Sequence, residues 1–187
     1  MTENANEQET LYLPDIRCPD VQAFIAALLS QSKKSAFGRQ PRIQNTAHNP
    51  EYVRTVNDDY PALQCWFNCI DYCLKKGGTP VYGWLIARLE NPLGYVAQHH
   101  AVVNTGTELL DLTYGGQFDK ILFVPDSTTP LSLETNPMYI PANFYAEEGK
   151  THWQGIDDES DNFYLLKMAP QTAHLALITQ AKTKNII

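Results

Sequence analysis

Residues 95–113 constrain the fold of this chain most, because they predict two antiparallel strands joined by a tight turn. Residues 95–103, YVAQHHAVV, are rich in valine and aromatic residues, as strands are. Residues 108–113, ELLDLT, form a second run of alternating strand-like character. The residues between them, 104–107, read NTGT, a turn sequence in which Gly106 can adopt a positive φ. We therefore expect a local β-hairpin.

The register of this hairpin decides which histidine faces the aspartate. A turn centred on Thr105 and Gly106 sets His100 directly opposite Asp111, where Cβ atoms lie roughly 4.5–5.5 Å apart. A three-residue loop shifts the register by one residue and sets His99 opposite Asp111 instead. Such a shift also exchanges the two faces of the strand. Aspartate is uncommon in strands, so a buried one needs a partner. We expect a His100–Asp111 pair.

Residues 64–76 predict a helix that ends at Gly77, after two lysines that suit a helix C-terminus. Cys65, Cys69 and Cys73 recur every four residues and share one face, and apolar residues line another. Cys69 and Cys73 are interpreted as small buried core residues. Cys65 differs because it lies in the first turn, where free amides and the helix dipole stabilise a thiolate.

Cys65, His100 and Asp111 together predict a catalytic triad of nucleophile, general base and orienting carboxylate. Such a triad needs no cofactor, and none is expected. The side-chain amides of Gln64 and Asn68 are candidates to stabilise an oxyanion.

Aromatic residues near the triad are candidates for the wall of a substrate cleft. Two of them, Tyr82 and Trp84, lie in the strand predicted after the cysteine helix, and Tyr114 follows the aspartate strand. Plain core packing is the alternative interpretation for each.

A zinc site is a different use of the same residues. Cys65 and Cys69 at helical spacing would bind zinc together with His99 or His100 and Asp111. The spacing differs from the C-x2-C of common structural zinc sites, and the chain has no second cysteine pair. We therefore expect no metal.

Composition limits the class of protein. With 187 residues, the chain predicts a disordered N-terminus over residues 1–12 and a single α+β domain over 13–187, with its catalytic core at about 60–125. A net charge of −7 makes nucleic acid an unsuitable partner. No apolar run is long enough to span a membrane, and the polar start is not a Sec signal. We expect a reduced, cytoplasmic protein, with a non-Sec export route left open.

Other segments complete an α+β pattern of helix followed by a meander of strands. Residues 35–60 and 126–162 show weak periodicity and are expected to be irregular. Residues 163–168, FYLLKM, fit a short helix or a strand. The remaining predicted elements are helices at 20–31 and 169–182 and strands at 79–90 and 121–125.

The order of motifs resembles a known group of thiol enzymes. Residues 64–68 read QCWFN, residues 77–84 read GGTPVYGW, residues 99–103 read HHAVV and residues 109–113 read LLDLT. Together they resemble an uncharacterised bacterial family with C-x-x-N, YGW, HAV and L-x-D-x-T motifs. A helix-borne cysteine followed by strands carrying histidine and aspartate also resembles the papain-like and transglutaminase-like fold. Protein N-terminal glutamine amidohydrolases are similar in outline.

The resemblance implies a central cysteine-bearing helix packed on an antiparallel sheet. It implies a thiol-dependent hydrolase or acyltransferase of peptidase, amidase or deamidase type, acting on a peptide or protein amide. Two alternatives stay open at this point. One is a catalytically silent member of the fold that binds a protein partner through the acidic, aromatic segment 126–164, and the other is the small zinc-binding protein.

Overall fold

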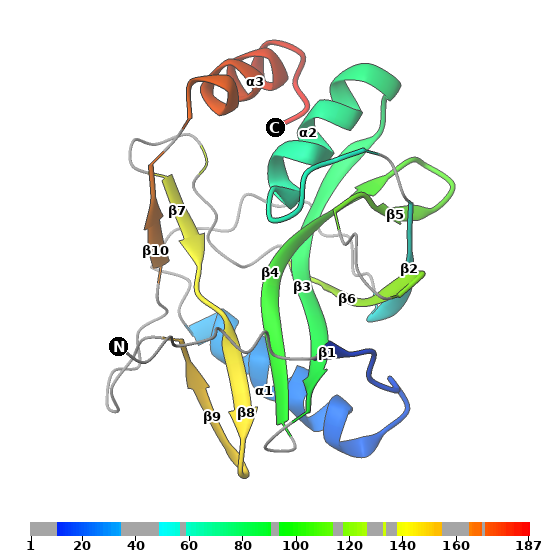
Figure 1. Cartoon of the computed structure of the whole chain (residues 1–187), viewed down its shortest axis with the longest axis vertical. Helices are drawn as coiled ribbons and strands as arrows, with labels where there is room; N and C mark the ends of the chain where they lie inside the picture. Colours follow the sequence, from blue (N-terminus) through cyan, green and yellow to red (C-terminus); the bar gives the residue numbers. More distant parts are fainter. Residues whose placement is uncertain are drawn as a thin grey trace, which may run out of the picture.

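The computed structural model describes residues 11–34, 49–56, 59–90, 94–113, 118–126, 133, 138–154, 165–169 and 171–187 (Figure 1). In chain order its elements are β1 (Leu11–Tyr12), α1 (Pro19–Lys34), β2 (Glu51–Thr55), α2 (Cys65–Lys76), β3 (Thr79–Leu89), β4 (Gly94–Asn104), β5 (Leu109–Asp111), β6 (Lys120–Pro125), β7 (Met138–Pro141), β8 (Phe144–Glu147), β9 (Lys150–Trp153), β10 (Leu165–Met168) and α3 (Thr172–Thr183). None of the helices in these ranges is long and apolar enough to cross a membrane.

Five of the described strands close into a small barrel in the order β3, β6, β2, β5 and β4, with β4 pairing back onto β3. β1 extends the sheet beyond β3, β8 and β9 extend it beyond β4, and β7 pairs separately with β10. The α+β class is confirmed. The expectation of an antiparallel sheet is wrong in one place, because β2 runs parallel to β5. A parallel neighbouring strand comes from a distant part of the chain, so no turn sequence between the two strands predicts their pairing.

The longest pairing joins β3 to β4 in register from Thr79 opposite Asn104 to Leu89 opposite Gly94. Gly83 lies opposite His100 in this hairpin and is also paired with β6. A Cβ atom at Gly83 would overlap the carbonyl oxygen of Val124. Glycine is therefore required where the end of β6 pairs closely with β3, and this pairing helps to close the barrel.

Alternating residues of the long hairpin face either the barrel interior or the helices outside it. Helix α2 packs on β3 and β4, as predicted, and α3 packs on α2. Helix α1 packs nearer the other end of the same hairpin (Figure 1). The barrel interior is filled mainly by Val53, Leu85, Val96, Val102, Ile121 and Phe123.

The strongly periodic segments fold as expected. The helices predicted at 20–31, 64–76 and 169–182 are confirmed as α1, α2 and α3, and the strands predicted at 79–90, 95–103, 108–113 and 121–125 are confirmed as β3, β4, β5 and β6.

The weakly periodic segments hold more structure than predicted. β2 lies within 35–60, and β7, β8 and β9 lie within 126–162, although both segments were expected to be irregular. β1 uses residues 11 and 12 of the predicted disordered terminus, and residues 1–10 lie outside the described residues. Residues 165–168 of the ambiguous FYLLKM segment form a strand. These strands are short, and most of them pair with strands distant in the chain, although β8 and β9 also form a local hairpin.

Candidate active site

The predicted His100–Asp111 pair is present. His100 Nε2 lies 2.8 Å from Asp111 Oδ1, and both side chains are buried, with His100 7% exposed and Asp111 fully covered. A bond of this length between an imidazole and a carboxylate is strong when both groups are shielded from water. The carboxylate thereby holds one ring nitrogen of His100 and fixes the orientation of the ring.

The strand register that brings His100 and Asp111 together differs from the predicted register. β4 and β5 pair Val103 with Leu110 and Asn104 with Leu109, so the turn is centred one residue later than expected. The turn is held by bonds of its own polar groups, including Gly106 N–H to Asn104 Oδ1 at 2.8 Å. The register is therefore shifted by two residues, which leaves the same side chains on the same face. His100 and Asp111 are diagonal neighbours, still within imidazole reach.

Asp111 accepts further hydrogen bonds from a strand that the sequence did not predict. Thr55 at the end of β2 is paired with Asp111, and its hydroxyl donates to Asp111 Oδ2 at 3.1 Å. The Thr113 backbone N–H donates to Oδ1 at 3.1 Å. Burial acts to raise the Asp111 pKa, but the bond and charge of His100 together with these donors lower the pKa below its ordinary value. Thr55 carries no sequence signal that would have identified it.

Cys65 is the first residue of α2, and it lies close enough to His100 to influence the pKa of the imidazole. Because Asp111 occupies His100 Nε2, the other ring nitrogen, Nδ1, is the one left for the thiol. Burial acts to lower the His100 pKa, whereas the neighbouring Cys65 and the hydrogen bond that the ring donates to Asp111 raise it to about 10. The three residues of the predicted triad therefore lie together.

The start of α2 leaves backbone N–H groups available. In the part of the chain that the structure describes, no side chain caps this helix. Gln64 is the N-cap residue, and its carbonyl accepts the first helical bond, from the Asn68 N–H. The amides of the first turn, including that of Cys65, point away from the helix body, and their partial positive charge favours an anion there.

Asn68, the second predicted oxyanion donor, is engaged elsewhere. Its amide nitrogen donates to the Pro61 carbonyl and to Thr113 Oγ1, both at 2.9 Å. A side-chain amide has only two hydrogens, so neither remains for a substrate. Asn68 instead ties the loop before α2 to the segment after β5, which holds the Cys65 and Asp111 segments together.

Gln64 has a different environment. Its side chain is half-buried, and its Oε1 lies 3.3 Å from His174 Nε2 on α3. No bond to the Gln64 amide nitrogen is present among the described residues. Gln64 therefore remains a candidate oxyanion donor. Its contact with α3 could not have been foreseen from the sequence, because His174 has no motif around it.

The three residues predicted to line a cleft do not share one environment. Trp84 is fully buried, donates its indole N–H to Asp126 Oδ2 at 3.0 Å, and packs in the cluster under α1. It is a core residue, so its prediction as a cleft wall is wrong. Tyr82 is partly buried beside the α2 cluster and stacks on the His99 ring. Tyr114 lies outside the described residues.

His99 has its own set of partners. The Trp66 indole N–H donates to His99 Nδ1 at 3.0 Å, so the ring proton of a neutral His99 sits on Nε2. Nε2 is buried without a hydrogen-bond partner among the described residues. Burial, more than any neighbouring charge, lowers the His99 pKa to about 3. His99 is therefore neutral at physiological pH and serves as an acceptor within an aromatic cluster.

The other helix cysteines behave as core residues. Cys69 and Cys73 are buried, and burial raises the pKa of both thiols, that of Cys73 to about 11. All four cysteines of the chain are free thiols. In the described ranges no group of three or more His, Cys, Asp or Glu side chains is placed to hold a metal ion. The zinc alternative therefore lacks a ligand set in this part of the chain.

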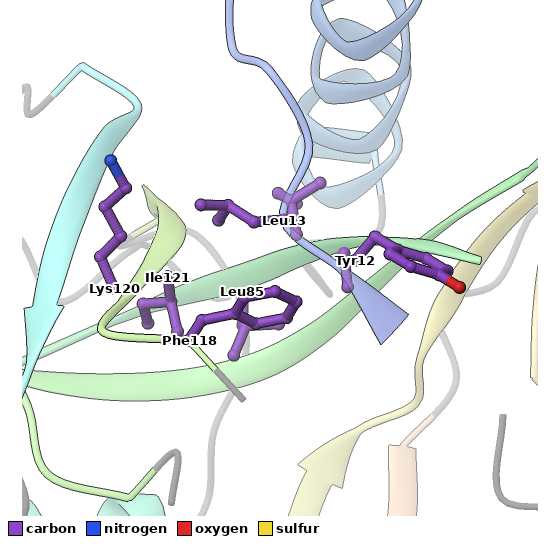
Figure 2. A pocket seen from close by; sticks show the side chains of 8 residues that line it. Tyr12, Leu13, Leu85, Phe118, Lys120 and Ile121 are labelled. Atoms are coloured by element: carbon purple, nitrogen blue, oxygen red, sulfur yellow. The ribbon is translucent and has the colours of Figure 1, made fainter. Parts of the chain in front are cut away.

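A small pocket lies elsewhere in the molecule, between β1, β3 and β6 (Figure 2). It has about 10 Å³ of space, barely room for one water molecule. Its lining residues are Tyr12, Leu13, Leu85, Ile86, Ala87, Phe118, Lys120 and Ile121. None of them belongs to the group around Cys65.

Comparison with known proteins identifies no family for this chain. A scan against protein-family models, a search of curated proteins and a search of solved structures each found no significant match. Support for a function therefore comes from the geometry around Cys65.

Proposed function

We propose that the protein is a thiol-dependent hydrolase or acyltransferase that acts on a peptide or protein amide through Cys65, His100 and Asp111. The observation that carries the proposal is the buried His100 ring, which is bonded to Asp111 at Nε2 and lies beside Cys65, the first residue of a helix. This is the arrangement of nucleophile, base and orienter that thiol catalysis requires. The motif resemblance to papain-like and transglutaminase-like proteins supports the same chemistry.

The residues have distinct roles in the proposed reaction. His100 accepts the thiol proton, and the Cys65 thiolate attacks the carbonyl carbon to form a C–S bond. The oxyanion is stabilised by the Cys65 backbone N–H and the Gln64 side-chain amide. His100 then protonates the leaving nitrogen as the C–N bond breaks. Water in a hydrolase, or an amine in an acyltransferase, attacks the thioester as His100 takes its proton, and the C–S bond breaks to release the product and the Cys65 thiolate.

The test is alkylation of the thiols by iodoacetamide at pH ~6, where an ordinary cysteine of pKa ~8.5 reacts slowly. We expect mass spectrometry to find Cys65 labelled before Cys18, Cys69 and Cys73. His100→Ala is expected to slow labelling of Cys65 at this pH by about tenfold or more, because it removes the base. His99→Ala is the matched control from the neighbouring position and is expected to change the labelling rate little.

The outcomes separate the alternatives. If all four cysteines label equally slowly, Cys65 is not activated and the enzyme proposal is wrong. Loss of labelling in His99→Ala and not in His100→Ala would assign the base to the other histidine. One zinc per chain in elemental analysis of the purified protein would contradict the thiol enzyme in favour of a metal site.

One observation favours a second candidate, the catalytically silent module that binds a protein partner. Cys65 is only 5% exposed, and His100 and Asp111 are covered as well. A buried hydrogen-bonded network of this kind also stabilises a fold without any reaction. Unreactive Cys65 in an otherwise folded protein would select this candidate.

A further inference from the structure

We infer that His174, on α3, is a positioning residue that holds the Gln64 side chain with its amide N–H groups turned toward the oxyanion. This inference rests on the proposed function, because it concerns the donor that the Cys65 reaction uses. His174 and Gln64 are 110 positions apart in the chain, and the packing of α3 on α2 brings them together.

The His174 ring is held tightly in place. It stacks on Phe67 with ring centroids 3.7 Å apart and planes inclined by 6°, and its side chain is buried to 9% exposure. Phe67 lies in the first turn of α2, two residues after Cys65. The ring is therefore fixed relative to the nucleophile by the same helix that carries it.

The hydrogen bond from His174 selects one end of the Gln64 amide. A neutral histidine with its proton on Nε2 donates to Gln64 Oε1, at the observed 3.3 Å. Burial lowers the His174 pKa, which keeps the ring neutral near pH 7. With its oxygen held, the amide has only its N–H groups left to offer a ligand, and no described residue accepts from them. An oriented donor without a protein partner is what an oxyanion site needs.

The position of Gln64 also indicates a role other than helix capping. The N-cap position favours Ser, Thr, Asp or Asn, whose short side chains bond the first-turn amides. Gln64 makes no such capping bond, and its side chain reaches α3 instead. The first-turn amides are thus left uncapped by Gln64, and the Gln64 amide N–H groups have no partner among the described residues.

Two reagents distinguish oxyanion stabilisation from simple thiol reactivity. p-Nitrophenyl acetate acylates a thiolate: a C–S bond forms at the acetyl carbon, the ester C–O bond breaks, p-nitrophenolate leaves, and the carbonyl oxygen carries negative charge on the way. Iodoacetamide alkylates the same thiolate by displacing iodide, and no oxyanion forms. The ratio of the two rate constants for Cys65 therefore reports the oxyanion donors and cancels changes in the thiol itself.

The main variant is His174→Phe, which keeps an aromatic ring to stack on Phe67 and removes the hydrogen bond. We expect the acylation-to-alkylation ratio to fall about tenfold, part of the 10²–10³ that complete loss of an oxyanion donor costs. His174→Gln keeps an N–H donor and is expected to restore most of the ratio. Leu175→Ala, at the exposed neighbouring position on α3, is the control and is expected to match the parent.

A double-mutant cycle separates positioning from general stabilisation. If His174 acts through Gln64, His174→Phe has no further effect on the ratio in a Gln64→Ala background. Equal ratios in the parent and His174→Phe, or fully additive effects in the cycle, overturn the inference. Should His174→Phe fail to fold, the ratio in Gln64→Ala decides in its place, and an unchanged ratio there overturns the inference. Slow alkylation of Cys65 in the parent protein overturns the proposed function itself.

Discussion

Asp111 carries more hydrogen bonds than any other side chain of the site. Its two oxygens accept from His100, Thr55 and the Thr113 backbone. The donors come from β4, β2 and the short segment that follows β5, so one carboxylate joins three segments of the barrel. Its charge balances the positive charge that His100 gains when it takes the thiol proton. Asp111 therefore links the stability of this region to the proposed reactivity of Cys65.

Asp111→Asn is expected to affect both properties. The variant keeps the shape of the side chain and loses the charge, so iodoacetamide labelling of Cys65 at pH ~6 should be slower than in the parent and faster than in His100→Ala. Urea unfolding should show a loss of ~1–3 kcal/mol, the cost of disturbing buried hydrogen bonds.

Asp126→Asn is the matched control for this prediction. Asp126 is also a buried carboxylate that accepts a bond from the Trp84 indole, and it is not among the groups that shift the His100 pKa. Asp126→Asn is expected to lower the stability of the protein and to leave the labelling rate of Cys65 unchanged. Equal labelling of both variants would show that the Asp111 charge plays no part in thiol activation.

At the scale of the elements, the β3–β4 hairpin is the scaffold on which the other parts are placed. Helix α2 packs on its outside, β5 pairs with the end of β4, and β6 pairs with β3. The β3–β6 pairing reaches Gly83, which lies directly opposite His100. The backbone that carries the general base is therefore positioned by a contact that only glycine permits.

Gly83→Ala is expected to destabilise the protein by about 3 kcal/mol, because the added methyl group overlaps the Val124 backbone in a closed barrel. Gly149→Ala is the comparison variant. Its φ of +76° strains an alanine by about 1 kcal/mol, and nothing lies near its Cβ position. Urea unfolding of the two variants measures the difference. A smaller loss of unfolding free energy for Gly83→Ala than for Gly149→Ala would contradict the requirement for glycine beside the Val124 backbone.

At the scale of the whole molecule, buried ionisable groups give stability a maximum near neutral pH. The unfolded chain binds a proton at His99 between its ordinary pKa of 6.5 and its folded pKa of about 3, so stability falls as the pH drops through this range. The lowered Asp111 pKa acts in the same direction, because its contribution is also lost in acid. The raised pKa of His100 contributes stability that is complete below 6.5 and is lost as pH rises through about 10.

His99→Gln isolates the acid part of this dependence. Glutamine offers an acceptor to the Trp66 indole and cannot take up a proton. Urea unfolding between pH 4 and pH 9 should show a shallower decline below pH ~6.5 in the variant, by up to about 1.36 kcal/mol per pH unit, the value for one proton. The alkaline side, which depends on His100, should be alike in both proteins. Parallel curves over the acid range would contradict the neutral, buried His99.

Local patterns in the sequence determined much of this protein. The helices and long strands follow from side-chain periodicity. Strand alternation predicts that His100 on β4 and Asp111 on β5 lie on the same face of the sheet. A register shift of two residues leaves them on that face for the same reason. The position of Cys65 at the start of a helix is predicted from the sequence of that helix and from the glycines that follow its C-terminus.

Tertiary structure decided what depends on distant partners. The parallel insertion of β2 beside β5 brings Thr55 to Asp111, and the packing of α3 on α2 brings His174 to Gln64. Burial of Trp84 under α1 makes it a core residue, and the Asn68 amide bonds two groups from other segments. None of these contacts has a local pattern. Each arises because closing a barrel and covering it with helices is decided by the total burial of apolar surface and the pairing of buried polar groups across the whole chain.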